Sequence, residues 1–106
     1  MPRKVFVVSK SAHDFSAAED FGDLVFLSEG PMDRYAANNM HRQFEAEMRN
    51  SGPEDYVLLC GLSVMNVVAT TIFVHLHGRL NLLLFKKGRY KEINLVYDKG
   101  GQRCNP

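Results

Sequence analysis

The chain has 106 residues, with 13 Lys and Arg against 12 Asp and Glu, and 45% of its residues are hydrophobic. This length predicts one domain, and the hydrophobic content excludes wholesale disorder. The net charge of +1 excludes a globally basic nucleic-acid binder and a protein with an acidic tail.

The first third of the chain contains two predicted strands separated by a loop. Residues 5–8 form a short β-branched and aromatic run, and residues 24–27 form a second one. Between them, residues 17–21 are expected to make one helical turn. Ser16 is its expected N-cap, and Glu19 stands at the spacing of a capping box.

Residues 31–49 are predicted to form one long amphipathic helix. Pro31 suits the first helical position, where its missing N–H is not needed, and residues 50–53 end the helix. Apolar side chains recur at three- and four-residue spacing and therefore share one face: Met32, Tyr35, Ala36, Met40, Phe44 and Met48.

A third strand and a second helix follow in the uncharged middle of the chain. Residues 56–60 are predicted as the strand and residues 64–77 as the helix, with Ser63 as N-cap and Gly78 just past the end. This helix is apolar nearly all round, so it is expected to be covered on most sides.

The chain then ends in a predicted hairpin and a tail. Residues 80–85 form an apolar strand, residues 86–88 a turn, and residues 90–97 an antiparallel edge strand. Residues 1–98 are expected to form the single domain, and residues 99–106 a frayed tail.

The order of elements, β-β-α-β-α-β-β, predicts a small α/β domain. We expect two or three layers around a mixed five-stranded sheet with a C-terminal hairpin. A ferredoxin-like arrangement is the alternative, but it needs the order βαββαβ.

Ligands of open α/β sheets bind beyond the carboxyl ends of the parallel strands, and three segments meet that criterion. They are residues 9–16, 28–30 and 61–66. In the last one a glycine turn leads into a helix N-terminus, which is a layout suited to an anion. The alternative for Ser63 is a plain N-cap. The predicted site for a small, nucleotide-like anion comprises Ser9, Lys10, His13, Ser28, Glu29, Gly61, Ser63 and Asn66.

The predicted second helix carries a polar stripe formed by Ser63, Asn66, Thr70 and His77. Buried polar groups need partners. Solvent, the preceding backbone turn, a ligand and a second subunit all remain open, and Thr70 has the carbonyl of Asn66 within reach.

His13 and Asp14 are the candidate catalytic pair of a small hydrolase or nuclease, since an Asp beside a His raises its pKa. Adjacent loop residues more often point apart, so we expect no catalysis. His75 and His77 lie two apart on a helix and do not share a face. We therefore expect neither a metal nor a cofactor.

The charges are segregated along the chain. Residues 13–56 carry ten acids and three arginines, and residues 78–106 carry seven bases and two acids. The pattern predicts two surfaces of opposite sign, explained by homo-oligomer formation or by a charged protein partner. Nucleic acid is not expected, because bases commonly protect hairpins and edges against aggregation. The bases of the hairpin are Arg79, Lys86, Lys87, Arg89 and Lys91.

The cysteines and the N-terminus bear on location. Cys60 is expected to be a small buried hydrophobe, and a disulfide with Cys104 is not expected. The apolar run at residues 5–8 is shorter than the ~7–15 residues of a signal peptide. The uncharged stretch 56–78 is interrupted at residues 60–63, so no membrane span is predicted. The expected location is cytoplasmic.

Several strings give the chain a resemblance to small accessory proteins encoded by tailed bacteriophages. The resemblance covers residues 5–97 and includes HDFS at 13–16, DYVL at 55–58, SVMN at 63–66 and HGRLNLL at 77–83. It implies a protein of the host cytoplasm, where small phage proteins inhibit or sequester components of host defence, including nucleotide signals. We therefore predict a non-enzymatic homo-oligomer that binds a small anion. The alternatives are a module that binds a host or virion protein, and the hydrolase.

Overall fold

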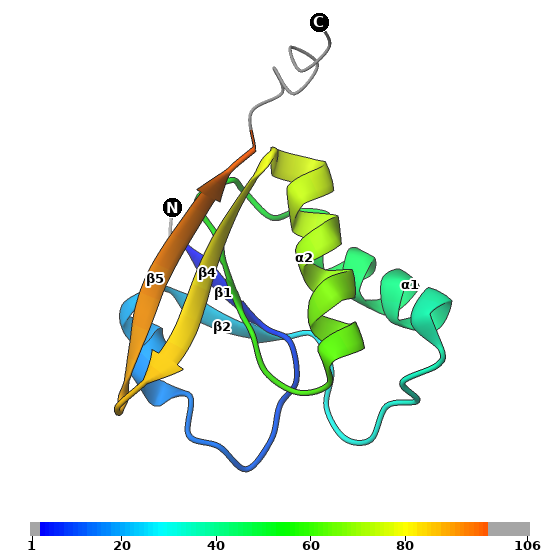
Figure 1. Cartoon of the computed structure of the whole chain (residues 1–106), viewed down its shortest axis with the longest axis horizontal. Coiled ribbons are helices and arrows are strands. Elements are labelled where there is room, and N and C mark those ends of the chain that lie inside the picture. The colour runs from blue at the N-terminus through cyan, green and yellow to red at the C-terminus, as the bar shows by residue number, and fades with distance from the viewer. Residues whose placement is uncertain (1–2, 98–106) are drawn as a thin grey trace, which may run out of the picture.

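The computed structural model describes residues 3–97, and its elements follow the predicted order (Figure 1). Cys104 and the predicted tail lie outside the described residues. The elements are β1 (Lys4–Val7), the 3₁₀ helix η1 (Ser16–Asp20), β2 (Asp23–Phe26), α1 (Ala37–Met48), β3 (Tyr56–Leu58), α2 (Ser63–His77), β4 (Arg79–Lys86) and β5 (Arg89–Val96).

The five strands form one mixed sheet in the order β2-β1-β3-β4-β5. The pairs β1–β2, β1–β3 and β3–β4 are parallel, and β5 runs antiparallel to β4. The predicted fold class is therefore confirmed. The direction in which the chain adds strands reverses between β1 and β3, which is the position where doubly wound sheets hold their ligands.

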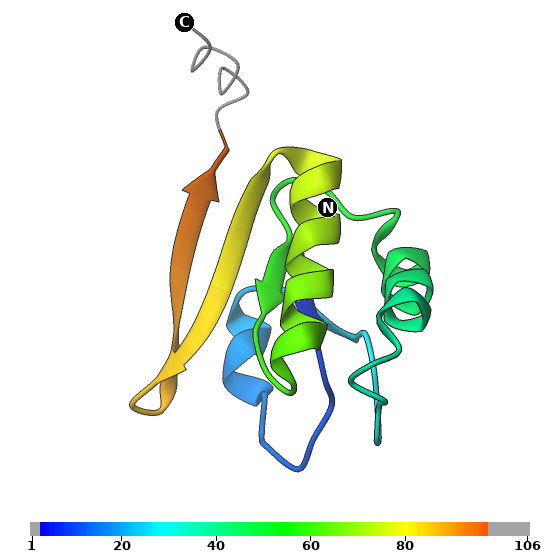
Figure 2. The ribbon, with the colours of Figure 1, turned by 45° about the vertical axis from the view of Figure 1, so that its right-hand side comes forward.

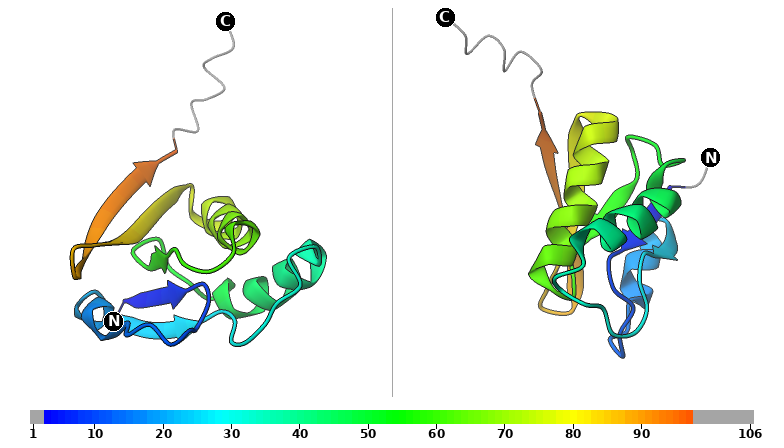
Figure 3. Two further views of the ribbon diagram at one scale, coloured as in Figure 1. Left: turned by 60° about the horizontal axis from the view of Figure 1, so that its bottom comes forward. Right: turned by 90° about the vertical axis from the view of Figure 1, so that its right-hand side faces the viewer.

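Both faces of the sheet are covered, which explains the nearly continuous apolar runs of its strands. Phe6 and Val8 of the first strand segment face α1 and α2, whereas Val5 and Val7 face η1. Figure 3 shows the two α-helices on one side of the sheet and the smaller η1 on the other. Met40, Phe44 and Met48 of α1 are fully buried, as their spacing predicts.

The helix α1 begins at Ala37, six residues later than predicted. The Asp33 side chain accepts the N–H of Tyr35 at 2.9 Å, and its carbonyl accepts the N–H of Ala36. This local turn competes with the helix. It leaves Tyr35 88% exposed rather than on the apolar face, so the placement of this residue was wrong.

The predicted serine caps are also wrong. Leu62 occupies the N-cap of α2, and Phe15 that of η1, neither with a capping side chain. Ser16 is instead held through its own N–H, which donates to Asp14. The predicted end of α2 is confirmed, since Gly78 takes the left-handed conformation with φ of 69°.

A buried polar cluster joins the strands at their amino ends. The carboxylate of Asp55 accepts the N–H groups of Lys4 and Gly52. The amide of Asn81 donates to the carbonyls of Pro53 and Asp55, at 2.7 and 2.8 Å. These bonds connect β1, β4 and the loop before β3, and they explain why a central strand contains an asparagine.

The β4–β5 hairpin projects beyond the rest of the sheet (Figure 2). Its two-residue turn, Lys87-Gly88, has positive φ at both positions, 51° and 83°, a backbone that continues the twist of the strands. Within residues 3–97, no helix has both the length and the apolar character to cross a bilayer.

Candidate functional site

The three predicted site segments do converge at the carboxyl ends of the strands. Lys10 and Glu29 form an isolated parallel β-bridge, and their side chains form an ion pair at 3.7 Å. Cys60 Sγ accepts the N–H of Ser9 at 3.3 Å. The loops after β1, β2 and β3 are thus joined to one another.

Ser9 and Gly61 lie in contact between β1 and β3, where the direction in which the chain adds strands reverses. This contact closes the position. Gly61 has φ of 81°, and a Cβ built there lies 2.8 Å from Cβ of Ser9. Cys60 is half-buried beside them, and this burial raises the pKa of its thiol. Ser9, Cys60 and Gly61 therefore fasten two loops together at this position.

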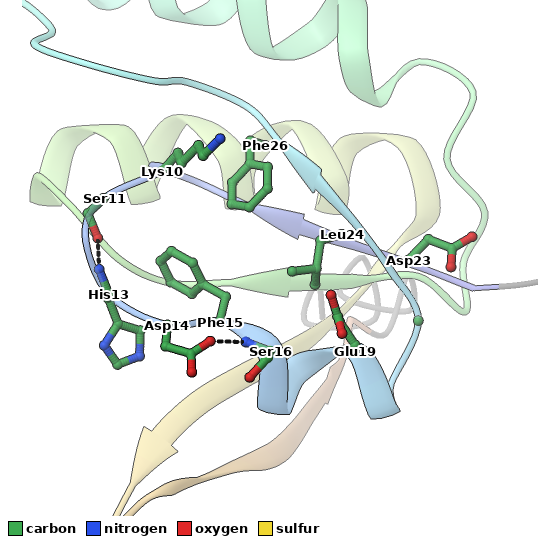
Figure 4. Close-up of a pocket in the computed structure, with 11 residues that line it drawn as sticks. Lys10, Ser11, His13, Asp14, Phe15, Ser16, Glu19, Asp23, Leu24 and Phe26 are labelled. Carbon is green, nitrogen blue, oxygen red and sulfur yellow. Dashed lines mark hydrogen bonds between the residues drawn. The ribbon is translucent and has the colours of Figure 1, made fainter.

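A cavity of about 700 Å³ lies further out on the η1 side, between residues 10–16, η1 and β2 (Figure 4). Lys10 and His13 line it, together with the carboxylates of Asp14, Glu19 and Asp23. Lys10 is already paired with Glu29. This balance of charge favours a neutral or cationic group over an anion.

The His13 and Asp14 side chains engage different partners. His13 Nε2 lies 3.2 Å from the hydroxyl of Tyr90. The carboxylate of Asp14 accepts the N–H of Ser16 at 2.9 Å, and chiefly this bond lowers the pKa of Asp14. The two side chains thus hold the loop in place, Asp14 within the loop and His13 against β5.

Much of the polar stripe on α2 is paired within the chain. The side chain of Asn66 accepts the N–H of Cys60, and Thr70 donates to the carbonyl of Asn66. His77 Nε2 lies 2.7 Å from Oγ of Ser51. Of the predicted site residues, Asn66 therefore orients the loop that precedes α2.

Two further predicted residues, Ser28 and Ser63, are separated by the fold. Ser28 is buried and donates its hydroxyl to the carbonyl of Val8 at 2.7 Å. Ser63 instead lines a cavity of about 340 Å³ with Arg34 and Tyr35. The cation there was not predicted, because the sequence placed Arg34 within a long helix.

A third hollow, of about 620 Å³, lies at the tip of the hairpin. From the sequence, the basic residues of the hairpin were interpreted only as protection of the sheet edge against aggregation. Strand pairing places Lys86 directly opposite Arg89. The pleat puts Lys91 on the same face of the ribbon as these two. The hollow is lined by Lys86, Lys87, Arg89, Tyr90 and Lys91.

The outer strand β5 is exposed along most of its length. Ile93 and Leu95 are 37% and 44% exposed on the face toward α2, and Val96 is 74% exposed on the other face. In the described part of the chain, β5 pairs with β4 only. Its outer edge therefore presents backbone groups and apolar side chains together.

Comparison with known proteins agrees with the resemblance to phage proteins. The model of the family described as "Phage Pam3 gp32-like protein" matches residues 3–97, which is the whole described chain. No curated protein and no solved structure matches the chain.

Proposed function

Since the chain belongs to the phage Pam3 gp32-like protein family, we propose that it is a phage accessory protein that acts by binding, as a symmetric homodimer formed through β5. The observation that carries this proposal is the outer edge of β5, which is eight residues long and exposed from Lys91 to Val96.

Edge strands of natural proteins are usually short, charged or covered, because an open apolar edge pairs with other chains. The positive charges of β5 are concentrated near the turn, at Arg89 and Lys91. The second half of the strand is apolar at Leu95 and Val96. Such an edge favours a partner that adds a further strand.

A second copy of the chain fits this edge, because the sequence of β5 is compatible with antiparallel pairing to itself. In an antiparallel pairing centred on Ile93, this residue faces its copy, Glu92 faces Asn94 and Lys91 faces Leu95. No like charges meet. A shift of the centre to Glu92 would place two carboxylates opposite each other, which is unfavourable. The result is one ten-stranded sheet about a two-fold axis.

Light scattering tests the dimer, which should have about twice the 12.0 kDa mass of the chain. Ile93→Lys and Ile93→Glu should each give monomers, because like charges then face each other across the axis. Mixing the two variants should restore a dimer. Val67→Lys, a change at an exposed residue of α2, is the control and should leave the mass unchanged.

A wild-type chain that stays monomeric up to its solubility limit would overturn the proposal. So would a mixture of the Lys and Glu variants that remains monomeric, since the partner would then bind elsewhere.

We also propose a second candidate, binding of a small nucleotide-like anion in the cavity shared by Arg34 and Ser63. The guanidinium and the hydroxyl donate to phosphate oxygens, and the exposed ring of Tyr35 offers a stacking surface. Capture of a host-defence signal stays a prediction of the phage resemblance.

Thermal unfolding in the presence of nucleotides and cyclic nucleotides tests this candidate, because a ligand of the folded state raises Tm. Ser63→Trp should fill the cavity and abolish the shift, and Arg34→Gln should reduce it. Arg49→Gln, at the end of α1, is the matched control. Unchanged Tm values at millimolar nucleotide would rule the candidate out.

A further inference from the structure

The hairpin tip concentrates positive charge that the described chain leaves without a counter-ion. Lys86, Lys87, Arg89 and Lys91 are all exposed, and the ion pair found within residues 3–97 joins Lys10 to Glu29 instead. Like charges placed directly opposite on neighbouring strands destabilise a sheet. The pairing of Lys86 with Arg89 therefore costs stability in the free protein and is relieved by an external anion.

The lining of the tip decides between two classes of anionic partner. Protein interfaces have a core from which charged residues are depleted and in which aromatic and apolar side chains predominate. The hollow has four cations and one tyrosine, and Tyr90 is only 7% exposed. A nucleic-acid backbone requires dense positive charge and no apolar core.

The shape of the hairpin also favours nucleic acid as the partner. Leu82 and Leu83 of β4 pair with β3, and the turn end of the two eight-residue strands extends past this pairing (Figure 2). Lys86, Arg89 and Lys91 share one face of this end, and a duplex that lies across this face places its phosphates against them. We infer that the β4–β5 tip binds the phosphate backbone of nucleic acid through Lys86, Arg89 and Lys91. The low net charge of the chain conceals this local surface.

The spacing of two tips extends the inference, and this step rests on the proposed dimer. Ile93 lies five residues from Gly88, or about 17 Å along a strand. A dimer centred on Ile93 therefore holds its tips about 34 Å apart, which is close to one helical turn of B-DNA. Both tips then reach one duplex.

Fluorescence anisotropy with labelled duplex and single-stranded oligonucleotides, over a range of salt concentrations, tests the inference. The triple variant Lys86→Gln, Arg89→Gln and Lys91→Gln should bind at least about tenfold more weakly. The slope of log K against log salt should fall by about 0.9 for each duplex phosphate that the variant no longer neutralises. The control exchanges three other arginines, Arg3→Gln, Arg42→Gln and Arg49→Gln, and should retain wild-type affinity.

The variant Ile93→Asn tests nucleic-acid binding by the tip separately from the proposed dimer. If the tip binds and the dimer also exists, this variant becomes monomeric and loses about half of the salt slope, yet binding remains sensitive to Lys86→Gln. If the tip binds but the chain does not dimerise, the wild type has the mass of one chain and the salt slope of one tip.

Three results would overturn the inference. The first is no binding to either oligonucleotide at low salt. The second is an equal loss of affinity in the triple tip variant and in the arginine control. The third is equally tight binding of polyglutamate, which would indicate an acidic protein as the partner. Comparison of the affinities for duplex and single-stranded oligonucleotides shows which form of nucleic acid supplies the phosphates.

Discussion

At the scale of single residues, several predicted site residues at the carboxyl ends of the strands contact a neighbouring loop. These contacts occupy groups of a kind that also suits a ligand. Ser9 and Gly61 approach so closely that a side chain does not fit between them. Asn66 and Cys60 hold the second loop in place. The predicted site residues therefore determine loop geometry as much as they offer binding groups.

Gly61→Ala should destabilise the fold more than Gly30→Ala does. Both glycines have left-handed φ values, 81° and 85°, so each substitution costs about 1 kcal/mol in backbone strain. Only the Cβ at position 61 meets a neighbour, and crowding adds about 1–3 kcal/mol. Urea unfolding measures the difference, and equal losses would contradict the close packing of Ser9.

His77 should make stability depend on pH near neutrality. Burial lowers its pKa from 6.5, although Asp55 and Glu54 act in the opposite direction. The unfolded chain thus binds the proton more readily. The stabilisation present above pH 6.5 is lost as the pH falls through the unfolded and then the folded pKa.

His77→Gln should weaken the loss of Tm between about pH 7.5 and about pH 5.5. His41→Gln, at an exposed position of α1, serves as the control. An unaltered pH profile in the His77 variant would argue against this assignment. Asp14, whose pKa is lowered from 3.8, affects stability only at a more acidic pH.

At the scale of elements, strands followed their sequence patterns more closely than helix ends did. The β-branched, aromatic and apolar runs predicted each strand to within two residues at either end, and Gly88 marked the hairpin turn. The start of α1 was not predictable from apolar spacing, because Asp33 forms a turn whose stability depends on local hydrogen bonds.

Asn81→Ala should destabilise the junction of β4 with the loop before β3 by about 2–4 kcal/mol, because two carbonyls lose their donors. Asn94→Ala removes a more exposed amide that bonds to Asn81 itself. It should cost less than about 1 kcal/mol. Chemical unfolding of both variants checks this, and similar losses would contradict a specific role of Asn81.

At the scale of the whole molecule, the two kinds of charge line different hollows. Asp14, Glu19 and Asp23 line the cavity beside β2, whereas the bases line the hollow at the turn of β4 and β5. The segregation was visible in the sequence. The closure of the site between Ser9 and Gly61 was not, since it depends on the distance between two loops far apart in the chain.

Salt distinguishes two ways of forming an oligomer. A dimer through the apolar part of β5 should persist near 1 M salt, where the Debye length is about 3 Å. A contact between the basic tip and the acidic edge of another copy should dissociate. Sedimentation at low and high salt separates them, and dissociation at high salt would favour the second arrangement.

The Lys87-Gly88 turn has a consequence for the order of folding. It lets β4 and β5 pair across two residues, whereas Val5 of β1 pairs with Tyr56 of β3, 51 residues away in the chain. Closing a short loop costs less chain entropy and takes microseconds. The hairpin is therefore positioned to form early and to template the parallel strands, and its amides should be among the first protected in pulsed hydrogen exchange during refolding.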